Sequence, residues 1–171
     1  AVPGVEGIPQ GTAVTRHASW PPPGLQAEAL YLHPDGQLWD FTSSVPDRAA
    51  RSASAYTYDP TTKRRKTLDA GREEAWGPHP DYRWDPLAEG NSSSFVTAPF
   101  TDTVAYAGQG SVDLWIRSSA TDTDIEATLT EVRPDGQEVF IQSGWLRASH
   151  RQLDPARSTE LVPFHTHQAE D

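Results

Sequence analysis

A serine stands directly before a histidine in the segment SGWLRASHR, residues 143–151, and a serine hydrolase needs both side chains. In hydrolases of the α/β type the nucleophile lies in a Gly-x-Ser-x-Gly turn, which exposes its hydroxyl beside the amides of an oxyanion hole. The chain contains no such pentapeptide. If the segment is an extended strand, Ser149 and His150 project to opposite faces and do not hydrogen-bond to each other. We therefore expect no catalytic residue in this chain.

Two other groups of side chains have the spacing of metal ligands. His165 and His167 are two positions apart, and on a strand both imidazoles would point to one face, as a zinc pair requires. The sequence identifies no third ligand. Asp122, Asp124 and Glu126 have calcium-like spacing, but the loop glycine and the later glutamate of an EF-hand are missing. A turn that opens a strand accounts for these acids, and we expect no metal site and no cofactor.

Six tryptophans are the remaining candidates for a binding surface. Such rings either stack on sugars in a lectin-like sandwich or fill a core or a domain interface. Both interpretations are open, and we prefer the second for most of them. A separate candidate, the run GQGS at residues 108–111, lacks the Gly-Lys-Ser/Thr end of a phosphate-binding loop. We interpret it as a glycine turn. The tryptophans are Trp20, Trp39, Trp76, Trp84, Trp115 and Trp145.

Size and composition limit the class of protein. The 171 residues are enough for one domain with a core. The absence of cysteine excludes disulfides and thiolate metal sites. The chain has no methionine and begins at Ala1, so we expect a processed or truncated fragment.

The balance of charge limits the partners. With 24 acidic and 14 basic residues the net charge is −10, which repels phosphate backbones and anionic lipid. We interpret the basic run KRRK, residues 63–66, as a solvated loop. No apolar run approaches the ~18 residues of a membrane span. We expect a soluble bacterial protein, cytoplasmic or secreted, with no nucleic-acid or membrane partner.

Turn residues predict the elements that carry these side chains. Fifteen prolines disfavour long helices, because an interior proline costs a helix about 3 kcal/mol. The sequence Pro-Asp-Gly occurs twice, in turns at 33–36 and 133–136, where proline pre-sets φ and glycine accepts a positive φ. The first turn predicts a hairpin of strands 27–32 and 37–41. The second predicts a hairpin of strands 124–132 and 137–141.

Alternation of apolar and polar residues predicts half-buried strands. Over 111–118 it places Val112, Leu114 and Ile116 on one face, which we expect to be core. Ile125 and Leu129 alternate with polar residues in the same way, as in an antiparallel sheet. Many short strands with frequent turns are typical of a β-sandwich or barrel.

We accordingly expect an all-β fold in a single domain over residues 1–171. Residues 1–13 would form an N-terminal extension. Residues 61–85 would form a long connecting loop with one helical turn at 72–76, and the length of this loop favours a contact surface.

Three stretches carry a resemblance to a known family. They are SWPPPGLQAEALYLHPDGQL at 19–38, YTYDP at 56–60, and FVTAPF at 95–100 followed by the segment 110–151. They resemble the C-terminal domain of X-prolyl dipeptidyl-peptidases and cocaine-esterase-like acyl hydrolases (the CocE/NonD group), and cover most of residues 14–151. The resemblance implies a non-catalytic jelly-roll β-sandwich of the galactose-binding-like kind. The catalytic serine, aspartate and histidine would then belong to a preceding α/β-hydrolase domain of the same polypeptide.

The resemblance also implies a role in a serine esterase or an X-Pro dipeptidyl-peptidase. The jelly roll would pack on the catalytic domain and help to shape the substrate pocket. Ser149 and His150 would be strand residues, with Arg147 and Arg151 available to pair acids across the sheet. Candidate pocket or domain-interface residues are Trp20, Trp76, Trp84 and Trp145.

The resemblance is incomplete at two places. The segment after Asp59-Pro60 differs from the proline- and glycine-containing stretch of the family. The later strands, including a Gly-x-Arg-[Leu/Ile]-Arg segment, do not occur in the sequence, so we expect a jelly roll truncated at its C-terminal end. An unpaired sheet edge would then allow a homo-oligomer. A free-standing carbohydrate-binding sandwich, or a metallohydrolase using His165 and His167, are the alternatives.

Overall fold

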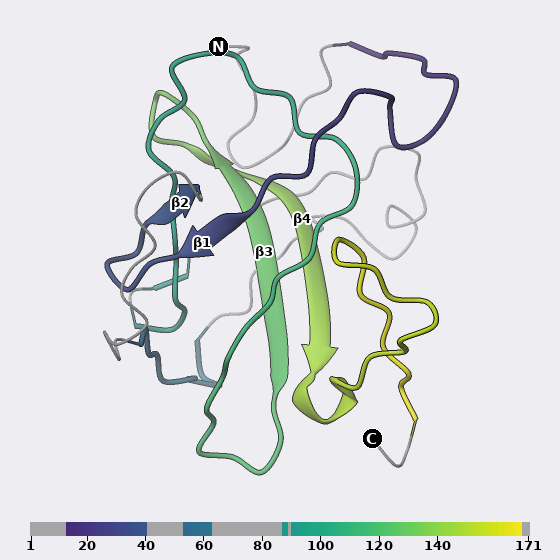
Figure 1. Cartoon of the computed structure of the whole chain (residues 1–171). Coiled ribbons are helices and arrows are strands. Elements are labelled where there is room, and N and C mark those ends of the chain that lie inside the picture. The colour runs from purple at the N-terminus through teal and green to yellow at the C-terminus, as the bar shows by residue number, and fades with distance from the viewer. Residues whose placement is uncertain (1–12, 41–52, 63–86, 89, 169–171) are drawn as a thin grey trace, which may run out of the picture. The chain divides into compact units, whose positions relative to one another are not determined.

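The structure, a computed structural model, describes residues 13–40, 53–62, 87–88 and 90–168. Its strands form two two-stranded antiparallel sheets, β1–β2 and β3–β4 (Figure 1). The described chain is strand-rich, with a single 3-10 turn, η2, beside the strands, and the prediction of an all-β protein is confirmed. The elements are β1 (Leu30–Leu32), β2 (Leu38–Asp40), β3 (Asp124–Val132), β4 (Glu138–Arg147) and η2 (Ala148–His150).

The chain divides into two compact units. One contains β1 and β2 together with residues 53–62 and 90–107. The other contains residues 108–168, and with them β3, β4 and η2. The helical turn expected at 72–76, nearly all of the N-terminal extension at 1–13 and of the loop at 61–85, and the residues Trp76 and Trp84 lie outside the described residues.

The hairpin predicted at Pro34-Asp35-Gly36 is confirmed, with shorter strands than expected. β1 and β2 are antiparallel, with Tyr31 opposite Trp39. The His33 amide donates to the Gln37 carbonyl at 2.8 Å, and the Gly36 amide donates to the His33 carbonyl at 3.0 Å. Gly36 has a φ of +83°, which a side chain would oppose. The Val96 amide donates to the Gly36 carbonyl at 2.9 Å and the Leu38 amide donates to the Val96 carbonyl at 2.8 Å, which makes a parallel bridge between Gln37 and Val96.

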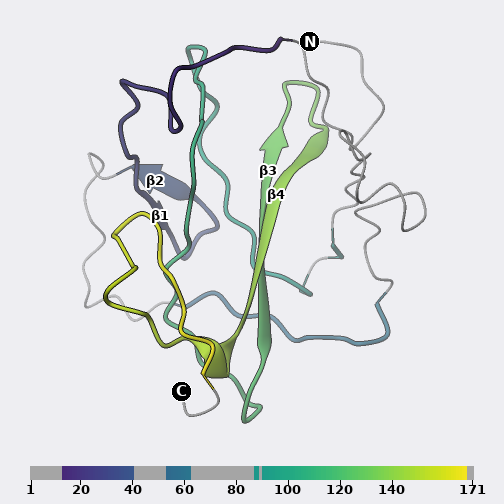
Figure 2. The same ribbon diagram turned by 90° about the vertical axis from the view of Figure 1, so that its right-hand side faces the viewer.

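The second hairpin is longer than predicted. Its turn repeats the geometry of the first, with the Arg133 amide 2.8 Å from the Gln137 carbonyl and Gly136 at a φ of +84°. β4 runs on to Arg147, past the expected end at 141. Opposite residues include Asp124 with Arg147 and Thr128 with Ser143, and a bulge lies after Leu129. Figures 1 and 2 show β3 and β4 side by side along their whole length.

The strand expected over 111–118 is wrong. No residue of this segment is in a strand, and Val112, Leu114 and Ile116 are exposed rather than in a core. A strand needs a neighbouring backbone that accepts and donates its hydrogen bonds. The alternation of apolar and polar residues is present over 111–118, but alternation does not provide a neighbouring backbone. The segment therefore does not form a strand.

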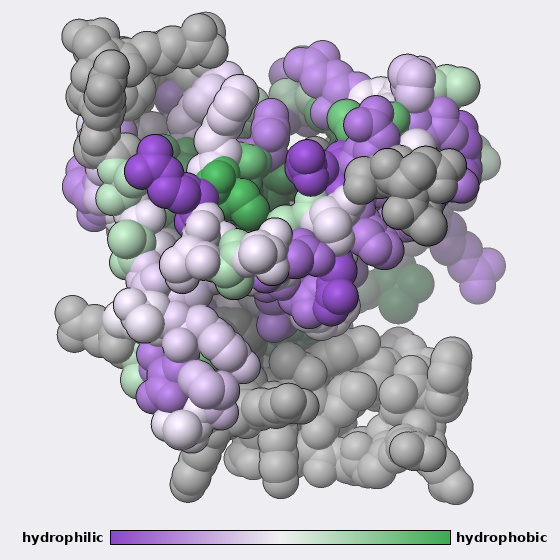
Figure 3. All heavy atoms as spheres, turned by 90° about the horizontal axis from the view of Figure 1, so that it is seen from below, coloured by the Kyte–Doolittle hydropathy of each residue, from purple (hydrophilic) through white to green (hydrophobic). Residues whose placement is uncertain are grey.

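Apolar burial is concentrated in β4. Val139 is 1% exposed and Phe140 is 5% exposed, and these two are the buried hydrophobic side chains of the described residues. Many other large apolar side chains reach the surface, including Trp115, which is fully exposed. Figure 3 shows apolar residues (green) at the surface among polar ones (purple). Trp20, Trp115 and Trp145 are exposed, so of the two uses expected for most tryptophans, core or domain interface, these three do not have the first within this chain.

In the part of the chain that the structure describes, no helix has the length and apolar character required to span a membrane.

Candidate functional site at the end of the long hairpin

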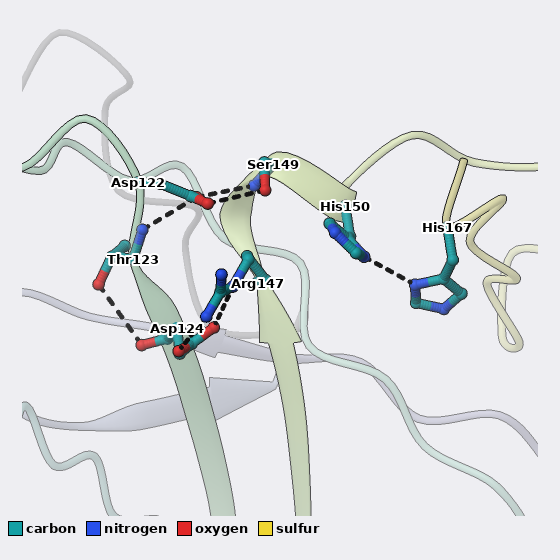
Figure 4. Close-up of polar contacts among 7 residues, drawn as sticks. All are labelled: Asp122, Thr123, Asp124, Arg147, Ser149, His150 and His167. Atoms are coloured by element: carbon teal, nitrogen blue, oxygen red, sulfur yellow. Dashed lines mark hydrogen bonds and ion pairs between the residues drawn. The ribbon is translucent and has the colours of Figure 1, made fainter. Parts of the chain in front are cut away.

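Polar side chains gather where β3 begins and β4 ends (Figure 4). The register places Asp124, the first residue of β3, opposite Arg147, the last residue of β4. Arg147 donates from Nε to Asp124 Oδ1 at 2.8 Å and from Nη2 to Oδ2 at 3.0 Å. The hydrogen bond from Arg147 lowers the pKa of Asp124 and raises that of the guanidinium. The prediction that Arg147 pairs an acid across the sheet is confirmed.

Asp122 organises the turn that follows β4. Its Oδ1 accepts hydrogen bonds from the amides of Thr123 at 2.9 Å and Ser149 at 3.0 Å, and its Oδ2 accepts one from Ser149 Oγ at 2.8 Å. The bond from the Ser149 side chain is the largest cause that lowers the pKa of Asp122. The Ala148 amide also donates to the Thr123 carbonyl at 2.8 Å. These bonds hold η2 against the start of β3.

Ser149 and His150 do not form a catalytic dyad, but the reason is not the extended strand that the sequence led us to expect. Ser149 and His150 lie in η2 and not in a strand. The Ser149 hydroxyl donates to Asp122, and a carboxylate with a lowered pKa is a weak base that cannot activate a nucleophile near neutral pH. The His150 ring is directed instead towards His167 (Figure 4). Ser149 is therefore a structural residue.

Three histidines come together at the end of η2 and in the C-terminal segment; we call His150, His165 and His167 the histidine cluster. The Nδ1 atoms of His150 and His167 are 3.3 Å apart. The ring centroids of these two residues are 5.6 Å apart, and those of His165 and His167 are 5.9 Å apart. His165 Nδ1 lies 3.2 Å from the Arg151 carbonyl oxygen. The sequence alone did not connect His150 with the other two.

Backbone hydrogen bonds return the C-terminal segment to η2. Leu153 and His165 form an antiparallel bridge. The Asp154 amide donates to the Phe164 carbonyl at 2.8 Å, and the Thr166 amide donates to the Gln152 carbonyl at 3.0 Å. Residues 165–167 do not form a regular strand, because His167 has a φ of +51°. The two histidines are nevertheless neighbours.

The other candidates from the sequence have different surroundings. The calcium-like acids Asp122 and Asp124 bind donors of the protein itself, as described above. Arg151 donates from Nη1 to the Ala148 carbonyl at 3.2 Å instead of to an acid. Trp39 stacks on His33, with ring centroids 4.4 Å apart. Trp20 and Trp145 are 67% and 69% exposed, so both rings are open to a partner.

The two lowered pKa values predict how stability responds to acid. A carboxyl whose pKa is lower in the folded chain than its ordinary value of 3.8 contributes stability above that value, and the contribution is lost as pH falls through the folded pKa. We expect Asp124→Asn and Asp122→Asn to have smaller losses of melting temperature than the parent chain when pH is lowered from ~7 to ~2. Thermal melts followed by circular dichroism measure this.

The control for this prediction is Asp113→Asn, which changes an exposed acid outside the site. We expect its acid dependence to match that of the parent chain. Equal acid slopes for all three variants and the parent would show that the two carboxyls do not contribute to folding in the way their hydrogen bonds indicate.

Comparisons with known proteins agree with the resemblance found in the sequence. The family described as the X-Pro dipeptidyl-peptidase C-terminal non-catalytic domain matches residues 5–169. The cocaine esterase of Rhodococcus sp. (strain MB1 Bresler) is 38% identical over 58 residues, which are 34% of this chain and 10% of that esterase. The matched part is thus about a tenth of that relative's length. No solved structure matches the chain.

Proposed function

Since the chain belongs to the family of X-Pro dipeptidyl-peptidase C-terminal non-catalytic domains, we propose that it is the accessory domain of a serine hydrolase. In this proposal it packs against the α/β-hydrolase catalytic domain of the same polypeptide and helps to shape the substrate pocket. The resemblance predicted from the sequence is confirmed at the level of the family. The catalytic partner, the pocket and the substrate belong to the proposal.

The exposure of large apolar side chains is the observation that carries the proposal. Val139 and Phe140 are buried, whereas Trp20, Trp115 and Trp145 are exposed in the described chain. Exposed large apolar side chains are available for contact with another domain, and tryptophan is enriched at interfaces. A catalytic domain in the same polypeptide would cover such surface at no cost in translational freedom. Trp76 and Trp84 remain proposed members of this interface.

The proposal divides the chemistry between two domains. The catalytic domain would cleave an ester, an amide or an X-Pro peptide by acyl transfer, with a serine nucleophile, a histidine base and an oxyanion hole. This chain would contribute loops that exclude water from the pocket and restrict the acyl or amine group. The hydrogen bond from Ser149 to Asp122 supports the assignment of the nucleophile to the other domain.

We propose that the fold is a jelly-roll β-sandwich of the galactose-binding-like type. The two antiparallel hairpins support it, because a sandwich is assembled from such units. The single domain over residues 1–171 is part of the same proposal. A second copy that pairs with a sheet edge would be an additional partner.

A carbohydrate-binding module is the second candidate, and the exposed tryptophans favour it as well. An indole that is 69% exposed, as in Trp145, is available to stack on a sugar ring. The two candidates differ in the size of the native protein. An accessory domain is part of a longer hydrolase, whereas a binding module can be a short protein without hydrolase activity.

The test is to capture the native protein with an antibody against this chain and to treat it with a fluorescent fluorophosphonate, which labels active-site serines. We expect a labelled polypeptide that is larger than the 18.8 kDa of this chain by at least one domain of roughly 100–200 residues. The isolated chain is the control and should remain unlabelled. A native product near 18.8 kDa, or a larger product without label, would contradict the proposal.

A further inference from the structure

The histidine cluster has two nitrogens at the separation of metal ligands. Nitrogens bound to a tetrahedral Zn²⁺ at about 2.0–2.1 Å lie about 3.3 Å from each other. The Nδ1 atoms of His150 and His167 are 3.3 Å apart. A hydrogen bond between protein groups is usually shorter, about 2.7–3.2 Å for an amide and an oxygen. The spacing therefore fits two ligands of one ion at least as well as it fits a hydrogen bond.

Both rings are held by structured backbone. His150 belongs to η2, which Asp122 anchors through two hydrogen bonds to Ser149. His167 follows the bonded pair Thr166 and Gln152, and its φ of +51° is an uncommon conformation for a residue other than glycine. Such conformations concentrate at ligand sites, where the surrounding structure maintains them. The two imidazoles are thus brought together before any ion binds.

The surroundings favour a cation that accepts imidazole. Asp122 and Asp124 lie at the same end of the hairpin (Figure 4), and Arg147 pairs with Asp124 and leaves the negative charge of Asp122 without a paired cation among the residues drawn. His167 is exposed and His150 is half-buried, so an ion reaches the pair from solvent. Imidazole suits Zn²⁺, Cu²⁺ and Ni²⁺, whereas Mg²⁺ and Ca²⁺ prefer oxygen. These observations select the chemical class of the ligand.

We propose that His150 and His167 form a two-histidine site for a divalent transition-metal ion such as Zn²⁺ or Ni²⁺. Each residue binds through Nδ1, and water or a ligand from a partner occupies the other positions. Among the described residues no three histidines or acids are already arranged around one ion, so the site is open. The ion joins the end of β4 to the C-terminal segment. This site is independent of the proposed hydrolase role.

His165 supplies a matched control. Its Nδ1 contacts the Arg151 carbonyl oxygen at 3.2 Å, and no three histidines or acids of the described residues are arranged around one ion, so His165 is not counted with the pair. It belongs to the same cluster and has the same side chain as the two ligands. We therefore expect His165→Ala to retain metal binding, while His150→Ala and His167→Ala lose it.

The experiment is titration calorimetry of the purified chain without an affinity tag, freed of metal by chelator, against ZnCl₂ and NiCl₂. We expect one ion per chain. His150→Ala and His167→Ala should weaken binding at least as much as the ~10–100-fold loss that follows removal of an outer-shell partner. His165→Ala should bind within about twofold of the parent chain, and MgCl₂ should give no heat of binding.

Nitrogen NMR of the histidine rings distinguishes loss of a ligand from loss of the fold. In the unmutated chain Zn²⁺ should shift the Nδ1 resonances of His150 and His167 and leave the Nδ1 of His165 in place. Absence of stoichiometric binding, equal losses in all three alanine variants, or a zinc-dependent shift at His165 alone would overturn the proposal.

Discussion

Phe140→Ala is expected to lower the free energy of unfolding of this chain by about 3–5 kcal/mol. Phe140 is 5% exposed and stands beside Val139 as one of the two buried hydrophobic side chains of the described residues. Truncation removes its apolar contacts and leaves a cavity that the neighbours fill incompletely. Domains have about 5–15 kcal/mol of stability in total. A single substitution therefore removes a large part of what keeps the chain folded.

Urea unfolding followed by tryptophan fluorescence and circular dichroism measures the loss. Ile141→Ala is the matched control, because Ile141 is the adjacent residue of β4 and is 49% exposed. It has no residue opposite in β3, since the register passes from Gln142 to Phe140 at the bulge. We expect a change for Ile141→Ala well below that for Phe140→Ala. Similar losses for both would show that burial at Phe140 does not contribute as its exposure indicates.

Local chemistry explains which elements the sequence could predict. The conformation of each Pro-Asp-Gly turn depends on the residues of the turn and on the residue that follows the glycine. Both hairpins formed at the turns that the sequence predicted. The amide of the residue after each glycine also bonds to the turn aspartate, from Gln37 to Asp35 and from Gln137 to Asp135. Interactions over two to four positions can be read from a sequence because no other part of the chain decides them.

Pairing between distant segments explains what the sequence could not predict. The segment 111–118 has the alternation of a strand, but alternation does not specify a partner strand. The bond from Ser149 to Asp122 spans 27 positions, and the approach of His150 to His167 spans 17. Neither pair has a spacing rule that sequence analysis could use. Only a backbone that brings these residues together reveals them.

The tryptophans show a further limit. An indole is equally suited to a core, an interface or a sugar site, and the six positions carry no signal that separates these uses. The exposure of Trp20 and Trp145 removes the core for these two residues. Family membership then favours the interface over the sugar site.

If the chain is the accessory domain that we propose, Trp145→Ala in the full-length protein is expected to weaken its contact with the catalytic domain and to leave the isolated chain stable. Trp145 lies in β4 opposite Glu126 and is 69% exposed, so the isolated chain loses little on truncation. An exposed surface substitution changes stability by about 0.5 kcal/mol or less. A tryptophan that anchors an interface contributes about 2 kcal/mol or more, which is roughly a 30-fold change in the docking equilibrium.

Two measurements separate these effects. Thermal unfolding should show equal melting temperatures for the isolated chain with and without the substitution, but a lower one for the substituted full-length enzyme. Its kcat/KM should also fall, because an undocked domain no longer restricts the substrate pocket. Gln142→Ala, from the opposite face of the same strand, is the control and should change neither. If Trp145→Ala changes the full-length protein no more than Gln142→Ala does, Trp145 does not contact the catalytic domain. The interface would then lie elsewhere on this chain, because an anchoring side chain stabilises docking only through contact with the partner domain.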